Sequence, residues 1–229
     1  MDFQEKIRSI LIGIRYSKSF RLRDVTGSIA DYIVYSEDSP FDEGYFPEIT
    51  SMSNGEKVLR NTETGDYFRV NESDVIFSKK VSSNFEAAFA ELRDDVAPFL
   101  ERLFGKFKIR DVRRLGIIFQ HELEKPKKFE DAVKPLTDNL TGNVSGLAVK
   151  FAKKLPSQEA LIRKNVNDYV NTIYNFEQAE ELFSASYDYQ VYFEPIVEDL
   201  RDCKIVEFLD ASRASLDPRF YSILRKYEG

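Results

Sequence analysis

The sequence predicts an α+β fold in which one curved antiparallel sheet is backed by two long helices. Short segments of alternating apolar and polar residues, separated by Gly, Asn and Asp turns, are typical of antiparallel strands. Two long apolar stripes at helical spacing, at residues 83–104 and 203–227, each close a series of such segments. Because the order occurs twice, we expect an internal duplication, with one structural repeat at 1–108 and a second at 109–229, inside one compact domain.

The first repeat begins with a strand at residues 7–15, whose apolar residues lie on both faces, as in the interior of a sheet. Apolar residues at helical spacing predict a helix at 21–34, with Ser19 available as its N-cap. A meander of short strands should follow and end at 75–79. Its turn signals contain Asn, Gly or Asp, and they lie at 53–55, 64–66 and 71–73.

The helix at 83–104 is the most strongly patterned element of the chain. Phe85, Phe89 and Leu92 open an apolar stripe that continues through its length, and Gly105 is the expected stop. Pro98 predicts a kink, because proline removes a backbone hydrogen bond inside a helix. The final helix carries a late proline in the same way.

The second repeat is expected to begin with a strand at 112–122, followed by a weakly patterned helical segment at 128–140. Four further strands should precede the final helix, at 147–153, 160–165, 168–174 and 186–193.

Composition limits the class of protein. With 229 residues and 42% apolar content, the chain can form a core without staples, and a single cysteine, Cys203, excludes an internal disulfide. The N-terminus lacks the apolar region of a signal peptide, and no apolar run is long enough to span a bilayer, so we expect a soluble cytoplasmic protein with no membrane partner. A net charge of −6 argues against a surface that attracts phosphate everywhere.

The order strand, short helix, meander, long helix resembles one repeat of the TATA-box-binding protein architecture. This is a fold-level resemblance that implies no function. The alternative is a helix-grip fold, in which one curved sheet wraps around the C-terminal helix and leaves a ligand cavity.

A further resemblance lies in the segment from residue 76 to 123, where a long helix leads into a strand reading RLGIIF at 114–119. It resembles the central region of a sporadically distributed bacterial family of uncharacterised proteins, whose strand reads roughly Arg-Ile-Gly-Leu-Arg-Tyr. The stretch YDYQVYFEP at 187–195 and the RFY at 219–221 are similar to that family's last strand and helix. The resemblance implies a bacterial, cytoplasmic origin and no particular activity.

Catalytic chemistry has few candidates in this sequence. His121 is the only histidine, so we predict neither a histidine metal site nor a nucleophile triad, and we interpret His121 as a strand-end residue. Cys203 is interpreted as a small apolar residue near a helix start. Asp188, Gln190 and Tyr192 share one face of a strand, which polar alternation on a half-solvated sheet explains. We expect no enzyme activity, no metal and no cofactor, since glycine-rich phosphate loops are also absent.

Charge and aromatic residues provide the candidate binding residues. Between residues 106 and 128, eight cations face three acidic residues and predict an anion-binding edge: Lys106, Lys108, Arg110, Arg113, Arg114, Lys125, Lys127 and Lys128. Solvated loops, or lysines that guard a strand edge, would explain the same run. Four tyrosines are candidates for a stacking surface on an open sheet face, or for cross-strand pairs: Tyr67, Tyr169, Tyr187 and Tyr189.

The leading hypothesis is a non-enzymatic protein that recognises a protein partner through its open sheet face or the groove between repeats. One alternative is a small-molecule or nucleotide binding protein with a pocket under a long helix. Another is RNA or anion binding through residues 106–128. A closed pocket with convergent polar groups would favour the small molecule, and an open apolar face would favour the protein partner. The sequence leaves the oligomeric state open.

Overall fold

The computed structural model describes residues 2–123, 146–155, 165, 167–179 and 182–227. Its strands are β1 (Ile7–Tyr16), β2 (Glu48–Ser51), β3 (Lys57–Arg60), β4 (Tyr67–Val70), β5 (Asp74–Lys80), β6 (Val112–Leu123), β7 (Gly146–Leu155), β8 (Tyr169–Ala179) and β9 (Leu182–Val197). Its α-helices are α1 (Phe20–Tyr35), α2 (Phe85–Glu91), α3 (Ala97–Phe107), α5 (Ile205–Ser215) and α6 (Ser222–Tyr227).

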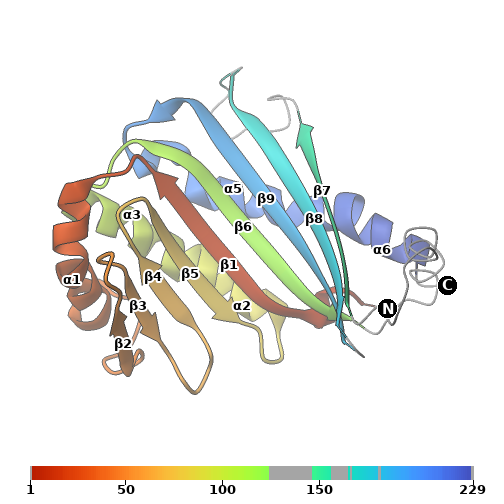
Figure 1. Cartoon of the computed structure of the whole chain (residues 1–229), viewed down its shortest axis with the longest axis horizontal. Coiled ribbons are helices and arrows are strands. Elements are labelled where there is room, and N and C mark those ends of the chain that lie inside the picture. The colour runs from red at the N-terminus through yellow and green to blue at the C-terminus, as the bar shows by residue number, and fades with distance from the viewer. Residues whose placement is uncertain (1, 124–145, 156–164, 166, 180–181, 228–229) are drawn as a thin grey trace.

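All nine described strands form one antiparallel sheet in the order β2-β3-β4-β5-β1-β6-β9-β8-β7 (Figure 1). The strand β1 lies near the middle, between β5 and β6, as its apolar residues on both faces predict. It runs antiparallel to β6, with Gly13 opposite Gly116 and Ile12 opposite Ile117. The predicted α+β class and single antiparallel sheet are confirmed.

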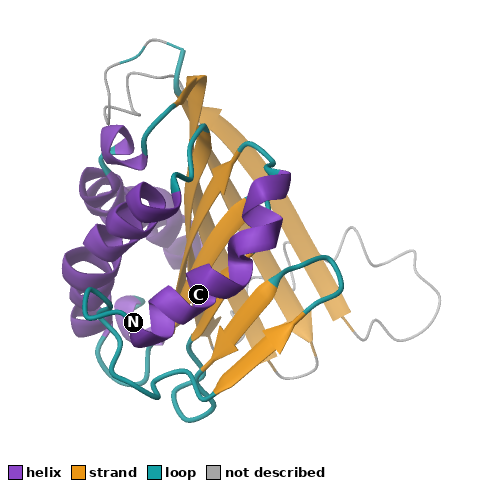
Figure 2. Ribbon diagram, turned by 90° about the vertical axis from the view of Figure 1, so that its left-hand side faces the viewer, coloured by secondary structure: helices purple, strands orange, loops and turns teal. Residues whose placement is uncertain are grey.

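The long helices pack on one face of this sheet, and the described part of the chain places no helix on the other face (Figure 2). Ile10, Ile12 and Ile14 point from β1 into this helix-covered face and are almost completely buried. From β6 and β9, Phe119 and Tyr187 reach the same core, where Tyr187 packs against Phe220 of the last helical stretch. We call the opposite side of the sheet the open face.

Both long helical stretches contain a π-helical segment. Residues Leu92–Val96 connect α2 to α3, and Leu216–Tyr221 connect α5 to α6. Pro98 lies just after the first segment and Pro218 lies within the second, where proline's missing N–H and its ring disturb the regular hydrogen bonds. Each long helical stretch is thus interrupted by a π-helical segment close to its proline, and the predicted kink at Pro98 stays a prediction.

The predicted stop at Gly105 is wrong, because α3 continues through it to Phe107. Lys108 ends the helix in the left-handed conformation, with φ 51°, and its backbone N–H donates to the Gly105 carbonyl oxygen. Phe107 is retained in the helix because its ring packs edge-on against Tyr32 of α1. Ser19 does occupy the N-cap position of α1, but its side chain makes no capping hydrogen bond.

The meander between α1 and α2 is confirmed as β2 to β5, with turns close to the predicted positions. In the second half, β7, β8 and β9 are longer than the predicted strands, and β9 extends over 16 residues. The predicted helical segment at 128–140 lies outside the described residues, as does nearly all of the predicted strand at 160–165. No helix in the described residues has the length and apolar content needed to cross a membrane.

Candidate functional site: an arginine pair on the open face

One row of side chains crosses the open face near the C-terminal end of β1. Residues that are directly opposite in an antiparallel sheet point to the same side. Arg15 of β1 lies opposite Arg114 of β6, Arg114 lies opposite Tyr192 of β9, and Tyr192 lies opposite Tyr169 of β8. The row therefore places two cations side by side, followed by two aromatic rings.

Arg15 and Arg114, which we call the arginine pair, have no acidic partner among the described residues. Neither forms an ion pair, and Arg15 is exposed. Arg114 is half-buried, and its Nη1 donates long hydrogen bonds to Tyr192 Oη (3.3 Å) and Gln190 Oε1 (3.5 Å). Its Nε is buried without a hydrogen-bond partner. Like charges directly opposite one another destabilise a sheet unless a counter-charge is present.

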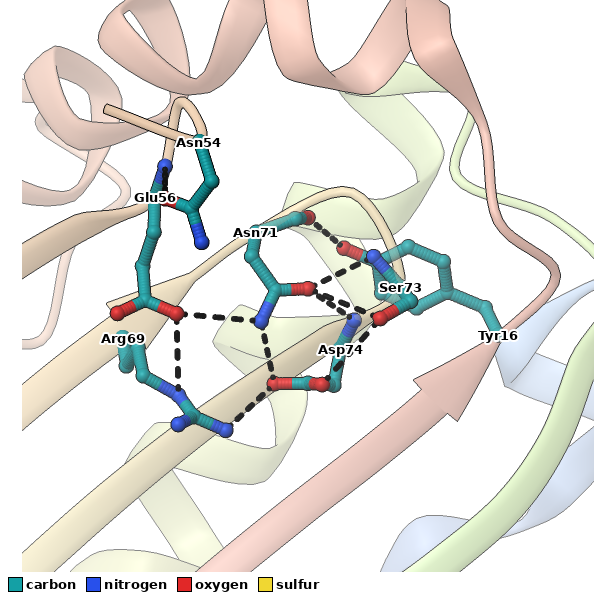
Figure 3. A network of polar contacts seen from close by, with 7 residues as sticks. All are labelled: Tyr16, Asn54, Glu56, Arg69, Asn71, Ser73 and Asp74. Atoms are coloured by element: carbon teal, nitrogen blue, oxygen red, sulfur yellow. Dashed lines mark hydrogen bonds and ion pairs between the residues drawn. The ribbon is translucent and has the colours of Figure 1, made fainter. Parts of the chain in front are cut away.

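Arg15 has an acidic neighbour on the edge of β1 that faces away from Arg114, because Asp74 of β5 lies directly opposite it. The Asp74 carboxylate is instead held by Arg69 and Asn71, at 2.8 Å and 3.0 Å (Figure 3). Arg69 also has Glu56 at 4.0 Å from its Nε. The Asp74 carboxylate therefore pairs with Arg69 and does not neutralise the arginine pair.

A hollow of about 690 Å³ opens beside the arginine pair, where β1, β6 and β9 meet; we call it the arginine hollow. Its lining contains four cations and one acidic residue: Arg15, Lys18, Arg113, Arg114 and Glu194. Lys18 is paired with Glu72 at 2.6 Å, whereas Arg113 donates from Nε only to the hydroxyl of Ser17, at 3.0 Å. The hollow is therefore a concave, cationic surface that opens to solvent.

A second hollow of about 410 Å³ adjoins the first through Lys18 and is lined by Arg21, Lys108 and Arg110 as well. Arg110 is neutralised by Glu198, while Arg21 donates to the Phe107 carbonyl oxygen at 2.7 Å. The connecting loop holds Lys108 and Asp111 at positive φ, a conformation that side chains other than glycine adopt at a cost. Backbone strain and unpaired cations thus occur at the same end of the sheet.

The aromatic part of the row forms a stack of four groups, which we call the tyrosine stack. The rings of Tyr192 and Tyr169 are 4.8 Å apart and nearly parallel, at 5°. The Arg114 guanidinium lies 5.6 Å from the Tyr192 centroid, and Lys154 of β7 places its Nζ 3.7 Å from the Tyr169 centroid. Each outer ring face is therefore covered by a cation, which the ring quadrupole attracts.

A chain of hydrogen bonds runs along β9 from the arginine pair. Tyr192 Oη donates to Gln190 Oε1 (2.9 Å), and Gln190 Nε2 donates to Asp188 Oδ2 (2.6 Å). Burial raises the pKa of Asp188 to about 6, although the Gln190 hydrogen bond and the charges of Arg114 and Lys150 act against this. Because Gln190 stands between them, Asp188 does not form an ion pair with Arg114.

Two of the predicted binding residues do not lie on the open face. Tyr187 and Tyr189 are buried on the helix-covered face, where Tyr187 hydrogen-bonds Ser215 at 3.0 Å and Tyr189 packs near Phe208. They cannot form an open stacking surface. The register instead places Tyr67 and Tyr169 on the open face, together with Asp188, Gln190 and Tyr192, which share one face as the alternation predicts.

The predicted basic segment is divided in the structure. Arg113 and Arg114 line the arginine hollow, while Lys108 and Arg110 line its neighbour. Lys106 lies on α3, with its Nζ 4.3 Å from the centroid of Tyr32. Three predicted residues lie outside the described part of the chain: Lys125, Lys127 and Lys128.

The remaining chemical candidates are in the core. His121 is buried, its Nε2 is 3.2 Å from Tyr221 Oη, and burial lowers its pKa to about 4, so the ring is neutral at pH 7. Cys203 is completely buried. Among the residues that the structure describes, no three His, Cys, Asp or Glu side chains gather closely enough to hold a metal ion.

Sequence reasoning missed Arg15, as well as Lys18 of the arginine hollow and Lys154 of the tyrosine stack. Arg15 follows an apolar strand and lies far from the basic segment in sequence, so only the pairing of β1 with β6 brings it to Arg114. A cation at the end of a central strand was the one available signal.

No family model matches this sequence, and no curated protein matches it.

Proposed function

We propose that this protein binds an anionic group, and that the arginine hollow is its binding site. The observation that carries the proposal is the contrast between two sets of arginines on one sheet face. Arg69 has two carboxylates within 4.0 Å, whereas the arginine pair has none in the described chain. A ligand that brings negative charge would supply the missing partner.

The energetics favour a phosphate-like group. Two unpaired arginines opposite one another cost the sheet a few tenths of a kcal/mol up to about 1 kcal/mol. A bound anion reverses this, because guanidinium groups bind phosphate oxygens through pairs of parallel hydrogen bonds. The exposed Arg15 provides donors of this kind, and Arg114 lines the same hollow.

The character of the open face also favours this function over a protein partner held by apolar contacts. The open face carries Arg15, Gln120, Asp188 and Gln190, which are polar or charged, and its apolar residues Leu11 and Ile118 are half-buried. The hollows open to solvent and are lined by several cations, which differs from the enclosed, mostly apolar pockets that small-molecule sites use. Anion binding is the expected function that fits both features.

We further propose that the fold arose by duplication, with two repeats arranged as in the TATA-box-binding protein. In support, β5 and β9 flank β1 and β6 on their outer sides, and Gly13 faces Gly116 at the centre. Both long helical stretches also carry a π-helical segment beside a proline. Duplication predicts that a single superposition of the two halves aligns β1 with β6 and also aligns the two long helical stretches. If no superposition aligns both, duplication is contradicted.

Titration with inorganic pyrophosphate at low ionic strength tests the binding site. We expect saturable binding by calorimetry, and a loss of affinity of roughly tenfold or more in the double variant Arg15→Gln, Arg114→Gln. The control is Arg60→Gln, which removes one positive charge from the exposed end of β3 on the same face and is matched in charge by each single variant, Arg15→Gln and Arg114→Gln. Absence of binding, or an equal loss in the control, would overturn the proposal.

A further inference from the structure

We infer that the ligand of the arginine hollow is a single strand of nucleic acid, which continues from the hollow across the tyrosine stack. This inference rests on the proposed function and adds the class of ligand. It is based on the order of groups along the row, where two arginines at one end and a lysine at the other flank two aromatic rings on adjacent strands.

The row has the spacing of an extended polymer rather than of one small anion. Arg15 and Lys154 are on β1 and β7, and three strands lie between these two. With strands about 4.8 Å apart, the row spans roughly 19 Å. One phosphate in the arginine hollow cannot reach Lys154 at that distance, so a ligand that uses both ends must carry several charges.

Between the two cationic ends lie only uncharged rings, those of Tyr192 and Tyr169. A ligand that complements this order alternates negative groups with flat, uncharged units, as a nucleic acid strand does. Acidic peptides and inorganic polyphosphate provide the charge but no such units. A duplex has its bases already stacked and paired, which leaves the tyrosines without a partner.

One ring face is suited to accept a base. The inner faces of Tyr192 and Tyr169 contact each other, and Arg114 covers the outer face of Tyr192. Among the described residues, the cation over the outer face of Tyr169 is Lys154, which is exposed. A base that stacks on Tyr169 displaces the ammonium, which then lies beside the backbone phosphate.

The neighbouring positions provide groups that bind base edges. Gln190 and Asn171 lie opposite each other on β9 and β8, one open-face position from the tyrosine pair. Gln190 is buried and its amide is held by Asp188 and Tyr192, so Asn171 is the amide of this pair that can hydrogen-bond the edge of an unpaired base. At the other end of the row, Lys18 and Lys108 extend the cationic surface into the second hollow, where the strand's further phosphates would lie.

The experiment is fluorescence anisotropy with labelled 12-nucleotide strands, U12 and dT12, using the whole chain. We expect Tyr169→Leu to weaken binding about tenfold, because one base loses its stacking partner, and Tyr169→Phe to restore it. The matched control is Tyr67→Leu, which removes a tyrosine from β4 on the same face and should change little. Circular dichroism and the thermal midpoint of each variant establish that it is folded.

Salt dependence provides a second readout that a merely structural role would not change. Replacing both members of the arginine pair with glutamine should reduce the slope of log affinity against log salt by about 1.4, since each phosphate contact on a single strand contributes about 0.7. An unchanged slope would overturn the placement of phosphates there.

The outcomes separate this inference from the proposed function. If pyrophosphate binds the arginine hollow but Tyr169→Leu leaves U12 and dT12 affinity unchanged, the inference fails and anion binding stands. The same holds if a 12-base-pair duplex, or a polyphosphate of equal charge, binds as tightly as the single strands. If neither pyrophosphate nor the single strands bind, both proposals fail.

Discussion

Two arginine environments lie close together on the open face of this sheet, and they differ in whether a carboxylate of the chain neutralises the guanidinium charge. Arg69 is held by Asp74 at 2.8 Å, and Asn71 fixes the same carboxylate from the adjoining turn (Figure 3). The arginine pair lies on β1 and β6, beyond β5 from Arg69, and has no carboxylate partner among the described residues. In the first environment carboxylates of the chain neutralise the arginine, although its Nε has no hydrogen-bond partner, and the second leaves its cations available to a ligand.

The difference teaches which polar groups shape this fold and which are candidates for function. A charged side chain that pairs with neighbouring residues stabilises the turn that contains them. Its removal should lower the stability of the fold and leave ligand binding unchanged. A charge that lacks a partner adds little or nothing to stability, and its removal should affect binding instead. The predictions below test this separation, from the largest expected effect to the smallest.

The largest effect is expected at Asn71. Its Oδ1 accepts from the backbone N–H groups of Ser73 and Asp74, at 2.8 Å and 2.9 Å, and its Nδ2 donates to Asp74. We expect Asn71→Ala to lower the free energy of unfolding by about 2–3 kcal/mol, measured by urea denaturation. The matched control is Asn54→Ala, which loses one hydrogen bond in an exposed turn and should cost less than about 1 kcal/mol. Equal losses would show that the Asn71 network adds nothing special.

At Asp188 the expected change is a gain in stability. The carboxyl keeps its proton up to about pH 6 in the folded chain and loses it near 3.8 when unfolded, so the folded state binds more protons between these values. The free energy of unfolding should therefore fall as pH rises from 4 to 6 and stay lower above. We expect Asp188→Asn to raise it by about 1–2 kcal/mol at pH 7.5 and to leave it unchanged near pH 3.5. A variant less stable at pH 7.5 would contradict a desolvated carboxylate.

A substitution at Arg69 tests whether its pairing with Asp74 is what leaves the arginine pair without a carboxylate. Removing it with Arg69→Leu frees the Asp74 carboxylate, whose cross-strand neighbour is Arg15. Asp74 should then pair with Arg15 and weaken pyrophosphate binding about threefold to tenfold, although Arg69 does not line the hollow. The double variant Arg69→Leu, Asp74→Asn should restore the affinity in calorimetry. If it does not, the loss comes from a change in the turn and not from a redirected carboxylate.

The smallest effect is expected at Arg15. Because Arg114 lies directly opposite, Arg15→Gln should raise the free energy of unfolding by about 0.2–0.5 kcal/mol at low salt, and the gain should disappear in 1 M salt. Arg60→Gln provides the contrast, since Arg60 lies opposite Glu48 and its removal should not stabilise. A loss of stability in Arg15→Gln that is independent of salt would show that Arg15 contributes by packing.

The sheet and the long helices could be predicted from sequence because they depend on repeating patterns. Alternation identifies β1 and β6, and the apolar stripe identifies the stretch from α2 to α3. The end of α3 could not be predicted, because the packing of Phe107 on Tyr32 outweighs the tendency of Gly105 to end a helix.

The site was only half predictable. Alternation shows that Tyr187 and Tyr189 share a face, but the helices decide which face is covered, and this depends on tertiary packing. Arg113 and Arg114 stood out as part of a basic run, while Arg15 joins them only through strand register. Whether a cation is already neutralised, as Arg69 is, cannot be read from the chain at all.

Gly13 and Gly116, at the centre of the sheet, bear on how many ligands one chain binds. A two-fold axis between Gly13 and Gly116 would exchange the Arg15–Arg114 contact with the contact between Leu11 and Ile118, which is the matching pair on the other side of the glycines. One contact is doubly charged and its counterpart is apolar. Within the described residues the pseudo-symmetry axis therefore relates the arginine pair to an apolar contact and not to a second cationic pair. On the inference above, a monomer should bind one strand in one polarity, and calorimetry should return one site per chain.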